Sequence, residues 1–186
     1  MFNGGDSDVV DNRLQILWDQ FEIRQVIEAY VHACDRADRD AVIDVYHEDS
    51  YDHHGKLSGP GHQFATECVK SLLEVWESCN HLLGQSRIKL DGDSAGAETF
   101  YFATQTRNDN GEMMMDQQLG RYVDQFERRD GVWRIKDRRC IQEWSMTFPL
   151  GDSFVERGTF IPGIRSEEDL SYKALGLKWG CSRITY

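Results

Sequence analysis

The hydrophobic residues follow a helical period in the first part of the chain and an alternating period in the middle. From residue 11 to about residue 37 they recur at spacings of three, four and seven, which predicts a long amphipathic helix. Shorter patterns predict a second helix over 38–46 and a third over 62–77, with a brief strand at 50–54 between them. The predicted buried stripe of the first helix comprises Ile16, Ile23, Ile27, Tyr30, Val31 and Cys34.

After the third helix the period changes to two. The alternation predicts strands over 81–90, 95–107, 116–128 and 132–144, with turns at Gly92, Asn108–Gly111 and Asp130–Gly131. Helices followed by an antiparallel meander are typical of an α+β domain. A long curved meander closed by helices is expected to enclose a cavity.

The chain length of 186 residues fits a single domain with short appendages. Residues 1–10 are rich in Gly and Asp and are expected to be a flexible N-terminus. Residues 11–146 are expected to form the domain. Residues 147–186 have irregular apolar spacing, so we expect an irregular extension that covers the pocket or contacts a neighbouring subunit.

Charge and composition limit the classes of partner and the location that we expect for the protein. The formal net charge is −11 and is spread along the chain, which argues against nucleic acid as a partner, because binding phosphates requires a basic surface. The sequence contains neither an apolar run of membrane-spanning length nor a signal peptide, so we expect no membrane association and a cytoplasmic location. The five cysteines lack CxxC spacing and are expected to be free thiols.

One acid on the first helix is unusually placed. Asp35 lies at the margin of the buried stripe, one turn beyond Val31, where an unpaired carboxylate would be costly to bury. It either faces a pocket or caps the second helix, whose first turn begins near Asp38. His81 opens the first long strand and is either an ordinary core or surface residue or a partner for Asp35. An Asp–His pair would be a plausible general base.

The alternation of side chains along a strand limits where the other candidate residues can point. His53 and His54 point to opposite faces of a strand and cannot both ligate one ion, so no metal site is expected, and at most one faces the pocket. On the last strand, Arg139 shares the parity of Ile135 and is expected to face inward, to bind an anionic group or to pair with Asp137. The absence of nucleotide-binding and hydrolase motifs predicts no cofactor.

Three segments together carry a resemblance to a known family. The run Tyr30–Asp38 (YVHACDRAD), the segment Val45–Gly55 (VYHEDSYDHHG) and the hairpin Asp130–Ile135 (DGVWRI) resemble the SnoaL-like branch of the NTF2-like superfamily, in the group of scytalone dehydratase and bile acid 7α-dehydratase. The resemblance covers about residues 12–146 and leaves the tail unexplained. It implies a cone-shaped α+β barrel, in which a bent, mostly antiparallel sheet wraps N-terminal helices and encloses an apolar pocket.

The same resemblance implies an activity. It points to a cofactor-free lyase, a dehydratase, in which Asp35 and His81 form the base and Tyr30 assists. The substrate would be a hydrophobic polycyclic or aromatic small molecule, with Tyr51, His53, His54 and Arg139 as further substrate contacts. A homo-oligomer, dimer or trimer, is expected. The alternatives are a ketosteroid-type isomerase, a polyketide cyclase, or a non-catalytic ligand-binding or dioxygenase β-like subunit.

Overall fold

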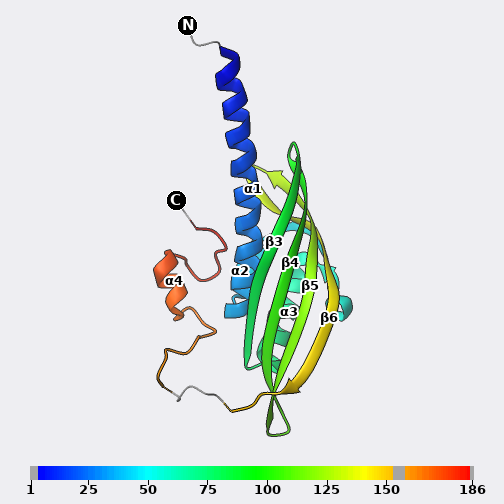
Figure 1. The fold of residues 1–186 in the computed structure, drawn as a ribbon, viewed down its shortest axis with the longest axis vertical. Coiled ribbons are helices and arrows are strands. Elements are labelled where there is room, and N and C mark those ends of the chain that lie inside the picture. The colour runs from blue at the N-terminus through cyan, green and yellow to red at the C-terminus, as the bar shows by residue number, and fades with distance from the viewer. Residues whose placement is uncertain (1–3, 153–157, 185–186) are drawn as a thin grey trace.

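A six-stranded sheet curls around the helices without closing into a complete barrel (Figure 1). The computed structural model describes residues 4–152 and 158–184 of the chain. The strand order is β2-β1-β6-β5-β4-β3, in which β1 and β6 are parallel and all other neighbours are antiparallel. The predicted α+β class with a bent, mostly antiparallel sheet is therefore confirmed.

Each of the four long predicted strands is present and is longer than its pattern indicated. The strands are β1 Tyr46–His53, β2 Gly59–Pro60, β3 Ser78–Asp91, β4 Ser94–Asp109, β5 Glu112–Arg129 and β6 Val132–Pro149. Two hairpins turn through adjacent residues with positive φ, at Asn110–Gly111 and Asp130–Gly131. Asn, Asp and Gly tolerate this left-handed conformation, which explains why these pairs connect the strands.

The helices are α1 Gly4–Arg36, α2 Arg39–Asp44 and α3 Gly61–Val75, followed in the tail by α4 Leu170–Leu175. The first helix begins seven residues earlier than predicted, and its N-terminal end extends past the sheet (Figure 1). Ile16 is 41% exposed there, so the predicted buried stripe is wrong at this position and holds from Ile23 onward. None of the helices in the described part of the chain is both long and apolar enough to cross a membrane.

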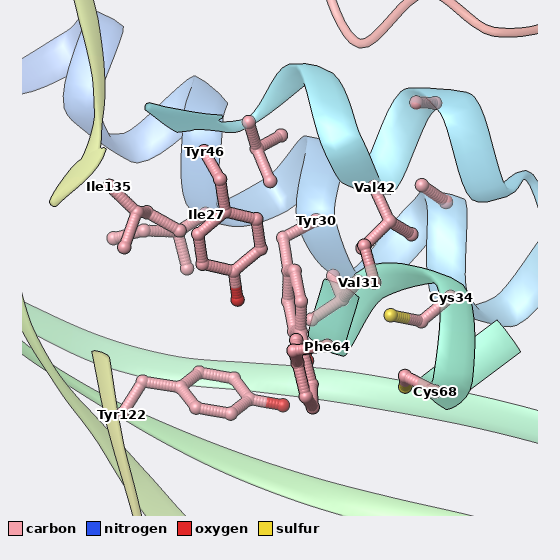
Figure 2. Close-up of a cluster of buried hydrophobic side chains, with 14 of the residues drawn as sticks. Ile27, Tyr30, Val31, Cys34, Val42, Tyr46, Phe64, Cys68, Tyr122 and Ile135 are labelled. Atoms are coloured by element: carbon pink, nitrogen blue, oxygen red, sulfur yellow. The ribbon is translucent and has the colours of Figure 1, made fainter. Parts of the chain in front are cut away.

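Aromatic side chains fill the space between the helices and the sheet. Figure 2 shows Tyr30 projecting from α1 among Tyr46, Phe64 and Tyr122, and all four side chains are at most 2% exposed. The Tyr30 ring meets the rings of Tyr46 and Tyr122 edge-on, at centroid distances of 6.2 and 5.5 Å. Edge-to-face packing of this kind is favourable between aromatic rings. The core of the cone is thus dense and contains several buried hydroxyl groups.

The C-terminal segment lies on the side of α1 that faces away from the sheet (Figure 1). It is attached through Asp38, which also caps α2 by accepting a hydrogen bond from the backbone N–H of Ala41. The second oxygen of Asp38 accepts hydrogen bonds from the Tyr172 hydroxyl, at 2.9 Å, and from the Gly180 backbone N–H, at 2.8 Å. One buried carboxylate therefore joins the helix corner to the tail.

Candidate active site

Asp35 and His81 are in direct contact. The backbone N–H of His81 donates to Asp35 Oδ2 at 2.9 Å, and His81 Nδ1 lies 2.6 Å from Asp35 Oδ1. The two side chains are 13% and 9% exposed. Because Asp38 rather than Asp35 caps α2, the capping alternative for Asp35 does not hold. The carboxylate fixes the orientation of the imidazole through Nδ1.

Charge and hydrogen bonding favour the protonated form of His81. Burial lowers the pKa of His81, but its hydrogen bonds to Asp35 and Cys79 outweigh this effect and raise the pKa to about 10. Cys79 Sγ lies 3.8 Å from His81 Nδ1. The three side chains offer one oxygen, one sulfur and one nitrogen within 4.8 Å of one another, a donor set that could also hold a zinc-type ion. That no metal is used therefore stays a prediction.

A buried arginine faces Tyr30 from the sheet. The guanidinium of Arg138 on β6 lies over the rings of both Tyr30 and Tyr122, 4.2 Å from each centroid. Its Nε and Nη2 donate to Asp124 at 2.8 and 2.7 Å, and both side chains of this ion pair are fully buried. Nη1 is buried and has no hydrogen-bond partner. One donor of a buried cation is therefore left unpaired beside the Tyr30 ring.

The prediction that Arg139 faces inward is wrong, and a β-bulge explains why. Gln125 and Phe126 of β5 pair with Asp137 and Ile135 of β6, which leaves Lys136 as an extra residue. An extra residue reverses the alternation of side chains beyond it. Arg139 is consequently 64% exposed and pairs with Asp137 at 3.3 Å, which was the predicted alternative.

Tyr51 and His53, which were also predicted to contact the substrate, lie on the outer face of the sheet as well. The side chains of Tyr51 and His53 lie on the outer side of β1, where their rings are 4.6 Å apart and His53 Nε2 contacts Asp137 at 3.2 Å. Tyr51 is exposed and His53 partly exposed, so neither faces the aromatic interior that was expected to receive substrate. Alternation along the strand places the neighbouring residues inside instead.

His54 is the histidine of this segment that faces inward. It stacks on Phe64 at 4.9 Å, and its Nδ1 lies 3.1 Å from Oδ1 of the fully buried Asp52. The Tyr46 hydroxyl donates to the other oxygen of Asp52 at 2.6 Å. Burial lowers the pKa of His54, but hydrogen bonds to Asp52 and Cys140 outweigh it and raise the pKa to about 10. The fold thus contains a second carboxylate–histidine pair.

Tyr101 lies between the two pairs. Its ring is 6.2 Å from the His81 ring, and its hydroxyl is 3.3 Å from the sulfur of Cys140. This placement requires Gly120 on the neighbouring strand, because a Cβ there would lie 2.5 Å from the Tyr101 hydroxyl oxygen and 2.3 Å from the Ile141 carbonyl oxygen. The glycine lets the tyrosine lie flat against the sheet between the two histidines.

Two cavities lie elsewhere in the molecule. One of about 340 Å³ lies between α1 and the C-terminal segment, and one of about 470 Å³ lies between α2, α3 and Trp179. Neither is lined by Asp35 or His81. The enclosed pocket expected beside the Asp–His pair therefore remains a prediction.

The sequence reasoning missed Arg138, Asp124 and the partner of His54. Asp52 and His54 lie two residues apart on the predicted strand 50–54, a spacing that places both side chains on one face and could have identified that pair. No comparable signal marks Arg138, because its inward orientation depends on the bulge at Lys136.

Comparisons with known proteins agree with this fold. Among solved structures, a hexachlorocyclohexane dehydrochlorinase of LinA type 2 superposes with a TM-score of 0.67 at 17% identity, over 78% of this chain and 99% of its own. A protein of Novosphingobium aromaticivorans that carries the provisional name scytalone dehydratase gives 0.62 at 14% identity, over 78% and 97%. At such identities the likeness shows the fold alone.

A third structure is the β subunit of a provisionally assigned aromatic-ring-hydroxylating dioxygenase from Novosphingobium aromaticivorans, with a TM-score of 0.56 at 24% identity, over 69% of this chain and 92% of its own. No curated protein matches the sequence. A family model described as the SnoaL-like domain matches residues 15–139, which include both histidine pairs and Arg138. The chain therefore belongs to the SnoaL-like domain family.

Proposed function

We propose that the chain is a cofactor-independent lyase, a dehydratase that acts on a hydrophobic aromatic or polycyclic small molecule. The observation that carries the proposal is the Asp35–His81 pair, held by two hydrogen bonds at an almost buried position. A carboxylate that fixes one imidazole nitrogen leaves the other to remove a proton. The fold relatives named for dehydrochlorinase and dehydratase activities support the same class of reaction.

In the proposed reaction one histidine removes a proton from the substrate and the other supplies a proton to the leaving group. Neutral His81 takes a proton from the carbon next to a carbonyl, and the electron pair of that C–H bond forms the new C=C bond as the neighbouring C–O bond breaks. The leaving hydroxide takes a proton from His54, whose raised pKa keeps it cationic, and departs as water. Tyr30, whose pKa burial raises well above its usual value, stays protonated and donates a hydrogen bond to the developing oxyanion.

The pKa of His81 sets the pH dependence of this reaction. Only neutral imidazole can accept the proton, and the Asp35 carboxylate stabilises the cation. At pH 7 a group with a pKa of about 10 is neutral in roughly one molecule in a thousand, so the rate should rise with pH across the neutral range. His54 must stay protonated, so the rate should fall again once this group loses its proton.

The test is a panel of hydroxylated steroids and aromatic β-hydroxy ketones, with formation of the conjugated enone followed by absorbance. His81→Ala is expected to lower kcat/KM about 10²- to 10⁴-fold on any substrate of the panel. His53→Gln is the matched control, because that histidine lies on the outer side of β1 and should leave the rate unchanged. Undiminished turnover by His81→Ala would overturn the proposed base.

A double-bond isomerase is the second candidate, since the same base would serve it. In that reaction His81 would return the proton to another carbon and no water would leave. The products separate the two: a dehydratase forms a product lighter by one water, and an isomerase forms a product of unchanged mass. The non-catalytic alternative, favoured by the likeness to a dioxygenase β subunit, predicts ligand binding without turnover.

A further inference from the structure

The cavity between α1 and the C-terminal segment lies outside the proposed active site. Its volume of about 340 Å³ is within the range of small-molecule sites, which is about 300–1,000 Å³. The α1 wall includes Trp18, Val26 and Ala29, of which Val26 and Ala29 also pack against the edge of the core. Trp133 at the start of β6 and Leu175 and Leu177 of the tail complete an apolar lining. The tail segment is therefore a wall of this cavity.

Hydrogen bonds and an ion pair hold the tail in place on both sides of α4. Ser182, which lines the cavity, donates from its hydroxyl to Asp44 at 2.6 Å, and Gly180 donates from its backbone to Asp38. On the other side of α4, Asp169 pairs with Arg36 at 2.9 Å. A cavity with fixed walls binds a ligand at a smaller entropic cost than one that must first be ordered.

One cation in the lining, Arg183, has an unsatisfied hydrogen-bond donor. No carboxylate of the described residues lies within 4.0 Å of Arg183, and its Nη2 is buried without a hydrogen-bond partner. The nearby carboxylate of Asp44 is already occupied by Arg134 and Ser182. Burial and the neighbouring charge of Arg134 lower the pKa of Arg183, and the carboxylates of Asp44 and Glu22 compensate for this only in part. An anion bound at this position would raise the pKa of Arg183 and so offset the effects of burial and of Arg134.

The acidic residues that line the cavity weaken the attraction between Arg183 and an anionic ligand only in part. Glu28 is paired with Arg24 at 3.0 Å. Glu22 interacts with the charges of Arg128 and Arg183, which lower its pKa against the larger opposing effects of burial and Asp19.

We propose that this cavity binds a flat aromatic carboxylate, with its ring system against Trp18 and Trp133 and its carboxylate on Arg183. Two indole rings and short aliphatic side chains suit a planar apolar body, and a guanidinium is the side chain best matched to a carboxylate. The site is separate from Asp35 and His81 and does not depend on the proposed lyase reaction.

The test compares two probes that share the naphthalene ring, the anionic 2-naphthoate and the neutral 2-naphthalenemethanol. Each is titrated into the full chain, labelled with ¹⁵N, and indole N–H signals are followed by NMR. Saturable shifts are expected for Trp18 and Trp133 but not for Trp144, which lies far along β6. The carboxylate should bind about tenfold more tightly than the alcohol, as one charge-assisted contact would provide.

Variants separate the contributions of charge and space. Arg183→Gln should bring the affinity for 2-naphthoate down to that for the alcohol, whereas Arg87→Gln, at an exposed position on β3, should change neither. Ala29→Phe should block both probes by filling the cavity, with folding checked by circular dichroism. His81→Ala should bind both probes as the wild type does, so this test is independent of catalysis.

Some results would overturn the proposal. These are the absence of saturable shifts at millimolar 2-naphthoate, equal affinity for the two probes in the wild type, or an unchanged preference in Arg183→Gln. Shifts centred on His81 instead of the two tryptophans would place the ligand in the other site and would also contradict it.

Discussion

Replacing Arg138 by Met should destabilise the protein strongly, because it leaves a carboxylate buried without a partner. Arg138 and Asp124 are both fully buried and joined by two hydrogen bonds. Removing one member of such a pair costs about 3–5 kcal/mol of the free energy of unfolding. The contacts with the Tyr30 and Tyr122 rings add roughly 1 kcal/mol each. The total is a large part of a typical domain stability of about 5–15 kcal/mol.

The matched control is the next residue along β6. Arg139→Met removes an exposed ion pair with Asp137 and should cost less than about 1 kcal/mol. Urea denaturation followed by tryptophan fluorescence measures both variants. The double variant with Asp124→Leu should recover part of the loss, since no carboxylate is then stranded. Equal losses for Arg138→Met and Arg139→Met would refute the assignment of inner and outer positions that follows from the bulge.

The pH dependence of the same variant gives an independent check. Burial raises the pKa of Asp124 above its unfolded value, and losing Arg138 raises it further. Such a group destabilises the fold increasingly as pH rises from the unfolded pKa through the folded one. The deficit of Arg138→Met should therefore be smaller at pH 5 than at pH 8, and a deficit that grows on acidification would contradict this account.

Three further predictions concern other parts of the fold. Asp35→Asn should lower the pKa of His81 from about 10 toward 6.5, measured by NMR titration of the labelled imidazole; a pKa that stays near 10 would show that Asp35 is not the main cause. Gly120→Ala should cost about 1–3 kcal/mol in urea denaturation, because its methyl group meets the Tyr101 hydroxyl, and an unchanged stability would show that the strand adjusts freely. Asp38→Ala should cost about 1–2 kcal/mol through the lost cap and should expose the tail to limited proteolysis, whereas protection equal to wild type would show that the other tail contacts suffice.

Most of the fold was predictable from the spacing of hydrophobic residues and from the residue types at the turns. The four long strands, their Asn-Gly and Asp-Gly turns and the three N-terminal helices follow from local patterns, because each element needs one face of apolar residues. The errors lie at element ends. The first helix continues to Gly4 although its outer turns bury little, as the exposed Ile16 shows. The added residues 4–10 are mainly Gly, Asp, Ser and Val, which have low helix propensity, so neither propensity nor the hydrophobic pattern predicts this extension.

The candidate site was predictable only where it depends on simple geometry. The contact between Asp35 and His81 follows from an acid at the end of a long helix and a histidine at the start of the facing strand. The alternation of side chains along the strand predicted that Arg139 faces inward, and this prediction is wrong. One extra residue at Lys136 exchanges the inner and outer faces of β6 beyond it, and the extra residue leaves no signature in the sequence. The pairing of Arg138 with Asp124 joins two strands and cannot be read from either one alone.

The three hydrogen bonds accepted by Asp38 have a consequence for the order in which the chain folds. Tyr172 and Gly180 can reach this carboxylate only after the corner between α1 and α2 exists, since the corner orients it. The tail is then expected to dock last, onto a domain that is already formed. The C-terminal segment would thus dock without altering the order in which the rest of the domain assembles.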